Sequence, residues 1–581
     1  MKKTLFAALA LVMLVGVAIV LPLSSAHAIE TFAFETETRI YDPAKSFGGY
    51  FMPSQSGGGT TYLMDMMGNI VHKWDGVGGT PQLLPNGNLG SRGQLMDWDG
   101  NILWAFNPAT DPTPVRPDVS GMHHDSRWIW NKKLQQYTNL IVTRRTVTQA
   151  EVVAAGGDPS INYGAPPTGI TNRLTILDVI IEVNQNKQIV WEWDFMGHTC
   201  QSRNPAWPKY VGDVKLAPGK CDIFWRTDAS QPDGPEGFIS DWQHVNSLDY
   251  NEDLDLIAVN ARQWSTFYVI DHGKTFVSTT NWAANKAAAA GPDGDFIYRF
   301  GNPSAYNQGK APSYYSEGHH QMYGSHNIQW IRPYHWERPH PEAGVQFGTR
   351  WTWPDPVGWT KSGIANPGAG NFLIYDNGLW NMSEWRRSKI LEINPYLNAT
   401  GVNTGAFVNP PDAGYTQTAR TSQGGTVGYR QISKQIVWKY ESNRINSFYS
   451  SHISGVSRLP NGNTSIMAGN QGHMFEVTPT GEVVWEYVNP GVVGAAKTIV
   501  KDGEEQQMFR HYRYGNDYPG LAGKDLTPQG TITGRIPSVV GSGITYPKPV
   551  TYFGFGFGAG GATVGGGGGI GAGTGGGVGG Y

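Results

Sequence analysis

One pattern of apolar and polar positions recurs along the chain. Each copy places an apolar residue first and an aromatic residue fifth, and most copies carry an aromatic residue third. This alternation is typical of a β-strand that buries one face. The copies lie at 70–74, 102–106, 189–193, 296–300, 436–440 and 483–487. The pattern therefore predicts six similar strands.

A second apolar segment precedes the repeated strand in several copies. Tyr62–Asp65 leads into the first copy through a turn with Gly68, and Phe475–Val477 leads into the last through Gly481. Glycine supplies the positive φ that tight hairpin turns need. Further apolar segments, such as Leu256–Asn260, alternate with these hairpins. Each repeat is therefore predicted to be a sheet of two hairpins.

Six four-stranded sheets repeated around an axis make a β-propeller, in which radial closure protects the sheet edges. We therefore predict an all-β, six-bladed β-propeller over 48–550, after a lead-in at 29–47. The segments 207–233 and 333–368 are too long for hairpin turns and are predicted to be long loops over one face. A β-sandwich is the alternative, but it does not explain why histidine recurs at one phase of the repeat.

The two ends of the chain differ from the repeats. Lys2 and Lys3, an apolar run and Ala26-His27-Ala28 predict a signal peptide at 1–28, with an uncleaved N-terminal anchor as the alternative. The signal predicts a periplasmic or extracellular protein. The Gly-rich segment 551–581 carries no charge and is predicted to be a flexible, disordered tail.

Composition adds two constraints. Charged residues make up 16% of the 581 residues and the formal net charge is −3, which argues against nucleic acid as the main partner. The only two cysteines, Cys200 and Cys221, lie close together in a chain that we expect to be exported. We therefore predict a disulfide between them, with two free thiols as the alternative.

Four histidines share one phase of the repeat. His124, His244, His326 and His452 each precede or begin the first strand of a blade, which lines the channel in a propeller. They are therefore predicted to meet at one channel mouth, although each alone could be structural. Neutral imidazoles could hold iron, copper or zinc. They could also bind an anionic ester with an arginine, one histidine acting as the nucleophile. Only His124, followed by Asp125, has an adjacent carboxylate.

Several segments resemble the bacterial arylsulfotransferase family, the exported aryl-sulfate sulfotransferases. They are 62–65 with 68–74, Asp241–Ser247, Asp376–Gly378 and the stretch from His452 to Pro490. The similarity extends over about 48–521. It implies a six-bladed propeller that moves a sulfuryl group from a phenolic sulfate ester to another phenol without PAPS, the nucleotide sulfate donor, or any other cofactor.

The resemblance also implies roles for individual residues. His452 is the candidate nucleophile, which would form a sulfohistidine, and His244, His326 and Arg387 complete the catalytic set. Substrate-binding roles fall on His124, Asn377 and Arg386. The implied partners are small phenolic donors and acceptors, and a homodimer is left open. The alternatives are a metal-dependent enzyme and a non-catalytic propeller used for binding or surface assembly.

Overall fold

The computed structural model describes residues 33–535, with gaps. The gaps are 56–58, 78, 112, 115, 117, 161–175, 226–240, 309–318, 333–366, 379–387, 410–414, 423–424, 442–447, 492–494 and 502–506. The predicted signal peptide, the Gly-rich tail and nearly all of the predicted loop at 333–368 lie outside the described residues. No helix in the described part is long and apolar enough to span a membrane.

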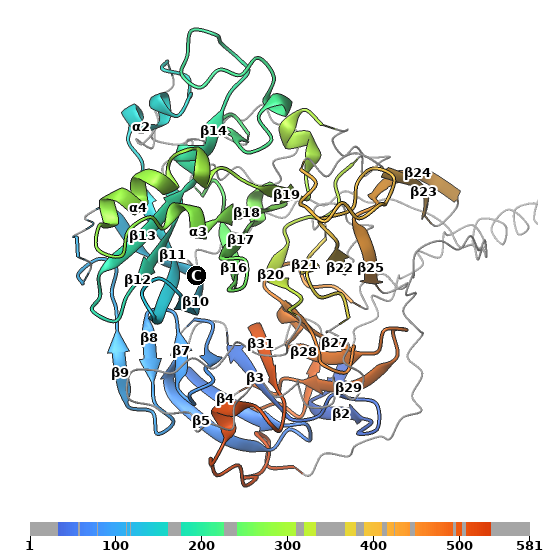
Figure 1. Cartoon of the computed structure of the whole chain (residues 1–581). Coiled ribbons are helices and arrows are strands. Elements are labelled where there is room, and N and C mark those ends of the chain that lie inside the picture. Colours follow the sequence, from blue (N-terminus) through green and yellow to red (C-terminus); the bar gives the residue numbers. More distant parts are fainter. Residues whose placement is uncertain are drawn as a thin grey trace, which may run out of the picture.

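Six β-sheets stand around a central axis as the blades of a propeller (Figure 1). The strands of each blade are given from inner to outer. Blade 1 consists of β31 (Met508–Tyr514), β3 (Tyr50–Gln55), β4 (Gly59–Asp65) and β5 (Ile70–Val77), and blade 2 of β6 (Gln82–Leu83), β7 (Leu89–Ser91), β8 (Gln94–Met96) and β9 (Ile102–Ala105). Blade 3 consists of β10 (Val119–Asn131), β11 (Gln136–Thr146), β12 (Ile176–Val183) and β13 (Ile189–Asp194).

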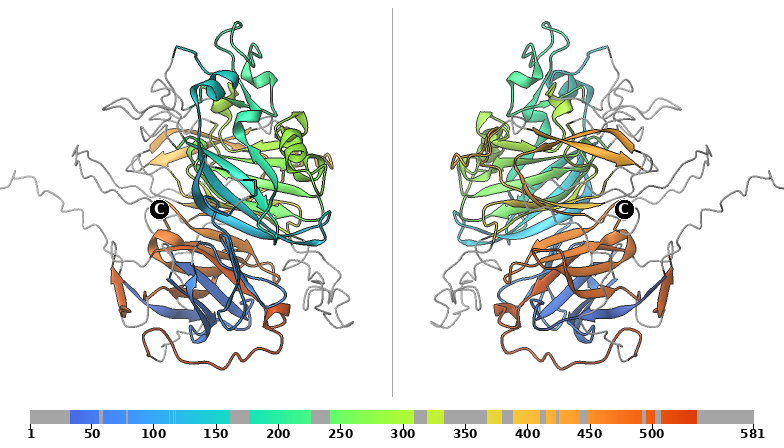
Figure 2. Two further views of the ribbon diagram at one scale, coloured as in Figure 1. Left: turned by 90° about the vertical axis from the view of Figure 1, so that its left-hand side faces the viewer. Right: turned by 90° about the vertical axis from the view of Figure 1, so that its right-hand side faces the viewer.

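Blades 4 to 6 follow around the axis. Blade 4 consists of β16 (Val245–Asn251), β17 (Leu256–Ala261), β18 (Thr266–Asp271) and β19 (Tyr298–Phe300). Blade 5 consists of β20 (His326–Trp330), β21 (Phe372–Asp376), β22 (Lys389–Ile393) and β25 (Ile436–Glu441). Blade 6 consists of β26 (Gly455–Arg458), β27 (Thr464–Ala468), β28 (His473–Val477), β29 (Val483–Val488) and β2 (Glu37–Tyr41). The predicted six-bladed propeller is thus confirmed, and the views in Figure 2 show the stacked blades from the side.

Both ends of the described chain close the ring. The C-terminal strand β31 pairs with β3 and becomes the inner strand of blade 1, while β2 adds a fifth strand outside β29 of blade 6. A short pair, β1 (Ala33–Glu35) with β30 (Ile499–Lys501), lies beside this closure. Blades 1 and 6 are therefore each built from segments near both ends of the described chain, which closes the ring of blades.

The repeated aromatic pattern links each blade to the next. All six predicted strands are found, as β5, β9, β13, β19, β25 and β29. In each strand, the side chain of the third residue of the repeat donates a hydrogen bond to the next blade. The acceptor lies in the loop that leads into the outer repeat strand of that blade. The pairs are His72 with the Trp98 carbonyl (2.8 Å), Trp104 with Gln185 (3.0 Å), Trp191 with Thr275 (3.0 Å), Tyr298 with Gln435 (2.7 Å), Trp438 with Pro479 (3.4 Å) and Trp485 with Met66 (2.9 Å). The repeat therefore encodes an inter-blade contact as well as a strand.

Smaller elements lie outside the blades. The helices are α2 (Gln149–Ala154), α3 (His272–Thr275) and α4 (Trp282–Ala289), and the 3-10 turns are η1 (Phe195–His198), η2 (Val214–Leu216), η3 (Arg262–Trp264), η4 (Pro292–Gly294), η5 (Pro303–Tyr306), η6 (Gly469–Gln471) and η7 (Pro519–Leu521). Two further strand pairs are β14 (Thr199–Cys200) with β15 (Cys221–Asp222) and β23 (Tyr415–Ser422) with β24 (Gly425–Ser433).

The predicted disulfide is wrong for this structure, because Cys200 and Cys221 are both free and buried. They lie on the parallel pair β14 and β15, in which Thr199, not Cys200, stands opposite Cys221. Neighbouring residues of a strand point to opposite faces, so Cys221 shares a face with Thr199. Burial raises the pKa of Cys200 to about 12, which keeps this thiol protonated.

A buried imidazolium joins blades 3 and 4. His272 Nδ1 lies 2.6 Å from Asp255, and its Nε2 lies 3.0 Å from Glu182 of β12. Burial alone would lower the pKa of His272, but the two carboxylates raise it to about 9. Because the folded pKa exceeds the ordinary value of 6.5, the stabilisation is complete below pH 6.5 and is lost as pH rises through 9.

We therefore expect the His272→Gln variant to lose about 3 kcal/mol of unfolding free energy at neutral pH. Its stability should also fall less than that of the parent chain between pH 6.5 and 9. Urea unfolding across this pH range measures both effects. Equal pH slopes for the two proteins would contradict a charged His272 in the folded state.

Candidate active site

The four sequence-predicted histidines lie in or just before four inner strands. His124 is within β10, His244 directly precedes β16, His326 begins β20, and His452 precedes β26. The structure brings them together in two contacts. The Nε2 atoms of His124 and His244 lie 2.8 Å apart, and the amide of Ile453, next to His452, donates to His326 Nε2 at 3.2 Å.

The backbone has a positive φ angle at or directly after each of the four histidines. The φ angle is 47° at His124, 51° at His244, 54° at Asn327 and 52° at Ile453. Residues other than glycine rarely adopt this left-handed backbone conformation, and those that do are often found at functional sites. Strand pairing is also shifted at these points in β10, β16 and β20. The left-handed residue is the histidine itself at His124 and His244, and it is the residue after the histidine at His326 and His452.

Sequence reasoning missed a charged network behind His244 and behind His123, the neighbour of His124. Asp241 accepts from His244 Nδ1 at 2.5 Å and from Arg144 at 2.7 Å. Arg144 also donates to His123 Nε2 at 2.5 Å, and His123 Nδ1 donates to Asp178 at 2.7 Å. The only sequence signals were the adjacency of His123 to His124 and the i,i+3 spacing of Asp241 and His244. The network holds the tautomers of both rings.

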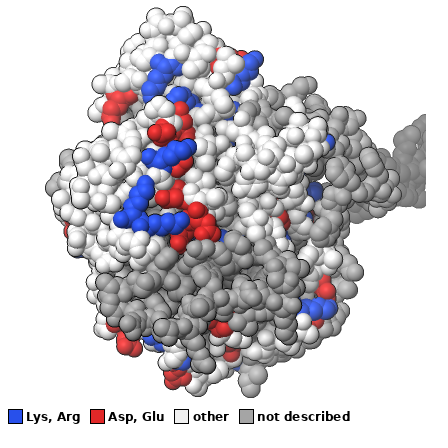
Figure 3. Space-filling view, viewed as in Figure 1, with Lys and Arg blue, Asp and Glu red and all other residues white. Residues whose placement is uncertain are grey.

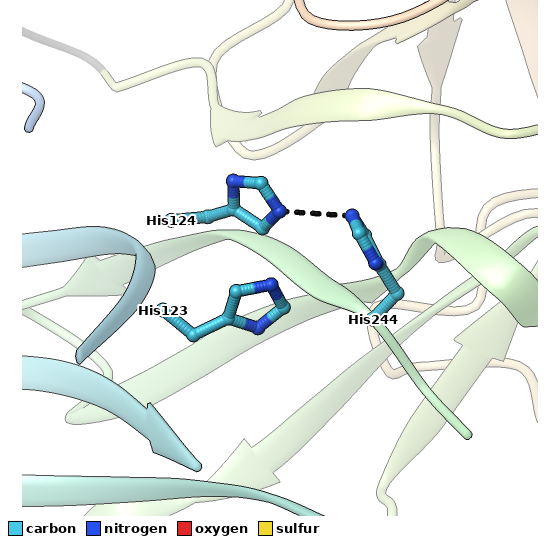
Figure 4. A group of neighbouring side chains, drawn as sticks. All are labelled: His123, His124 and His244. Atoms are coloured by element: carbon cyan, nitrogen blue, oxygen red, sulfur yellow. Dashed lines mark hydrogen bonds between the residues drawn. The ribbon is translucent and has the colours of Figure 1, made fainter. Parts of the chain in front are cut away.

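Figure 4 shows how His123, His124 and His244 lie. The rings of His123 and His124 lie next to each other, with centroids 4.0 Å apart and planes inclined by 44°, and His244 approaches from the neighbouring blade. Their ligand nitrogens lie within 4.8 Å of one another, so these three residues could hold a metal ion. The bond from Arg144 to His123 Nε2 opposes this, because that nitrogen already accepts a hydrogen from a cation.

The imidazoles at the channel mouth are neutral near pH 7. Burial lowers the pKa of His124, His244, His326 and His452 below the ordinary value of 6.5. Neighbouring positive groups add to this effect: Arg262 lowers the pKa of both His326 and His452. Burial alone would raise the pKa of Asp241, but His244 and Arg144 hold it well below its ordinary value. Neutral imidazoles beside cations suit attack on an anionic ester.

His326 and Asn377 have structural partners on both sides. Asn377 Oδ1 accepts from His326 Nδ1 at 2.7 Å, while its Nδ2 donates to the carbonyls of Ser450 and Ile453 at 2.8 and 2.9 Å. Both nitrogens of the buried His326 ring are therefore engaged. His452 is more open: it is half-buried and its Nδ1 pairs with Ser451 Oγ at 2.8 Å.

The predicted arginines, Arg386 and Arg387, lie outside the described residues. Two other arginines of the described part lie beside the histidines. Arg144 belongs to β11, and the amide of Arg262 donates to the His244 carbonyl at 3.2 Å. Charged side chains are sparse on the described part of the face in Figure 3, where they gather mainly in one band.

Asp125 does not support His124, although it follows it in sequence. It is fully buried and accepts from both Nη atoms of Arg510, at 3.1 and 2.9 Å. It also accepts from Thr80 Oγ1 and from the Leu248 amide, both at 2.9 Å. Asp125 therefore joins inner strands across the channel beneath the histidines.

Comparison with known families bears on this site. The sequence model of the family described as arylsulfotransferase (ASST) matches residues 162–284, which hold Asp178, Asp241, His244 and Arg262. The arylsulfotransferase resemblance is confirmed for this segment. Together with the propeller fold, the match supports arylsulfotransferase-type activity, and so a sulfotransferase enzyme in general.

Other comparisons add no functional argument. No curated protein matches the chain. A Bacteroides caccae protein of unknown function is 10% identical with a TM-score of 0.34, over 80% of this chain and 98% of that one. A putative 6-phosphogluconolactonase from Bacteroides fragilis is 8% identical with a TM-score of 0.28, over 81% and 100% of the two chains. Scores this low carry no argument about activity.

Proposed function

We propose that the channel mouth transfers a sulfuryl group from an aryl sulfate ester to a phenol, without PAPS and through a sulfohistidine. The observation that carries the proposal is the set of neutral imidazoles beside Arg144 and Arg262, in a propeller with an arylsulfotransferase segment. The small phenolic donors and acceptors are part of the proposal, as is export to the periplasm or beyond.

The transfer takes two steps in which atoms and charge balance. The His452 imidazole attacks sulfur, the bond from sulfur to the aryl oxygen breaks, and the aryl group leaves with the electron pair as a phenolate. The acceptor phenol then gives its proton to a neighbouring imidazole and attacks sulfur, and the bond from sulfur to nitrogen breaks with its electron pair returning to His452. The proton passes from that imidazole through water to the phenolate, which restores the site. Sulfuryl transfer resembles phosphoryl transfer, in which cations at the equatorial oxygens supply most of the stabilisation.

His124 and His244 can accept the proton that the acceptor phenol loses. His244 Nδ1 donates a hydrogen bond to Asp241, which leaves His244 Nε2 as an acceptor directed at His124. An acceptor phenol beside this pair can give up its proton to an imidazole nitrogen as it attacks sulfur. Arg144, bonded to Asp241, keeps that carboxylate ionised behind His244.

The test is phenol-dependent release of 4-nitrophenol from 4-nitrophenyl sulfate by the purified protein in the absence of PAPS. We expect the rate to rise with phenol concentration and phenyl sulfate to appear in equal amount. The variant Asp75→Ala, on the exposed part of β5, should match the parent chain. Release that does not respond to any phenol, or no release, would rule out the transfer.

A metal-dependent enzyme is the second candidate, favoured by the three imidazoles His123, His124 and His244 and by the carboxylates behind two of them. Carboxylate-backed imidazoles are typical of metal ligands. Elemental analysis of the purified protein separates the two candidates. A stoichiometric transition metal that is lost in a His124→Ala variant would favour this candidate over sulfuryl transfer.

A further inference from the structure

Phe509 is an aromatic residue of the inner strand β31 that takes no part in the core. Its strand neighbours Met508 and Tyr514 belong to two apolar clusters, whereas Phe509 belongs to none of the clusters formed by the described residues. It is also only half-buried. The Phe509 ring therefore lies outside the apolar clusters that its strand neighbours join.

The ring neighbours of Phe509 are groups of the channel mouth. Its centroid lies 5.7 Å from that of His124, with the planes inclined by 16°, and 6.5 Å from that of His326, with an inclination of 79°. The guanidinium of Arg510 lies 5.8 Å from the ring centroid. Phe509 thus places an apolar surface among the polar groups to which we assign sulfuryl transfer.

The backbone that carries the Phe509 ring is held in place by three contacts. Ser454, in the turn after His452, donates its amide hydrogen to the Phe509 carbonyl at 3.2 Å. The next residue, Arg510, is fixed by its ion pair with Asp125 at 2.9 Å. Gly469 lies so close that a Cβ there would meet the Met508 carbonyl oxygen. A surface that is already ordered in the free protein loses less conformational entropy when a ligand binds.

We propose that Phe509 is the residue that selects aromatic sulfate esters, by stacking against the aryl ring of the ligand while the histidines and arginines face its sulfate. This inference rests on the proposed function and adds the residue that reads the aryl group. An offset or edge-on aromatic pair adds about 0.5–1.5 kcal/mol beyond area burial, which corresponds to a preference of about 2- to 12-fold. Phe509 lies outside the family segment at 162–284.

Binding of sulfonates tests the inference without turnover, because their sulfur is bonded to carbon and cannot be transferred. We expect the parent chain to bind benzenesulfonate more tightly than methanesulfonate in calorimetric titrations. Phe509→Ala and Phe509→Leu should lose about 5- to 10-fold in benzenesulfonate affinity and leave methanesulfonate unchanged, whereas Phe509→Tyr should retain the preference. Leucine keeps an apolar side chain, which guards against misfolding of the alanine variant. Leu103→Ala, an exposed residue of β9, is the control.

The two proposals fail separately. A Phe509→Leu variant with the parent preference, or a parent chain that binds the two sulfonates equally, would overturn the role of Phe509 even if 4-nitrophenyl sulfate is turned over. If the protein prefers benzenesulfonate through Phe509 but does not turn over 4-nitrophenyl sulfate, the role of Phe509 is supported and the proposed sulfuryl transfer is wrong. With turnover, Phe509→Leu should raise KM for 4-nitrophenyl sulfate several-fold and change kcat less.

Discussion

The His452→Asn variant is expected to lose phenol-dependent sulfate transfer, with kcat lowered by at least about 1,000-fold. Asparagine can still accept a hydrogen bond from Ser451, which lies 2.8 Å from His452 Nδ1, but it has no lone pair able to take a sulfuryl group. The loss should therefore appear in the chemical step with little change in folding. Initial rates with 4-nitrophenyl sulfate and phenol measure it.

A covalent adduct gives a second measurement. Incubated with donor alone, the parent chain should gain one SO3 group by intact mass spectrometry, and the His452→Asn variant should gain none. The matched control is His473→Asn, which changes a histidine of the same blade that pairs with Glu486. A His452→Asn variant as active as the parent would contradict the assignment, and an adduct lost only in His244→Asn would move the nucleophile to His244.

Removing the carboxylate of Asp125 should have the largest effect on stability. We expect Asp125→Ala to cost about 3–5 kcal/mol of unfolding free energy. The buried guanidinium of Arg510 would lose its counter-ion, and Thr80 and the Leu248 amide would lose their acceptor. Because Arg510 lies on the closing strand β31, this loss weakens the joint between the two ends of the described chain. The midpoint of urea unfolding measures the effect.

A surface carboxylate supplies the control for this prediction. Asp75 is 67% exposed and pairs with Lys73 at 3.4 Å, so Asp75→Ala should cost less than about 1 kcal/mol. Combining Asp125→Ala with Arg510→Met should recover part of the loss, since Arg510 would then no longer be a buried charge without its counter-ion. If Asp125→Ala unfolds at the same midpoint as Asp75→Ala, the buried pair does not stabilise closure.

The fold was predictable because its signal is local and repeated. Strand alternation needs only neighbouring residues, and the aromatic third position recurs because each copy meets the same connection of the next blade, as Trp485 does at Met66. The closure was not predictable in this way. β2 does not carry the repeat pattern, and β31 carries only its first and fifth positions, at Met508 and Tyr512, without the aromatic third position. Each is placed by pairing with a strand hundreds of residues away.

The candidate site was predictable in part. The phase of the repeat identified His124, His244, His326 and His452, but it did not separate the half-buried ring of His452, bonded to the Ser451 and Gln507 side chains, from the buried ring of His326. The disulfide prediction failed for a related reason. Proximity in sequence brought Cys200 and Cys221 to neighbouring strands, and the register then turned them to different faces.

The sequence by itself determined the six blades and the phase at which histidines meet the channel, since both follow from periodicity along the chain. Only the tertiary structure decided which charges and rings stand around those histidines. Arg144, Asp178 and Asp241 come from separate strands and loops, and Phe509 comes from the closing strand. Such contacts depend on the register between blades and on chain closure, which no local pattern specifies.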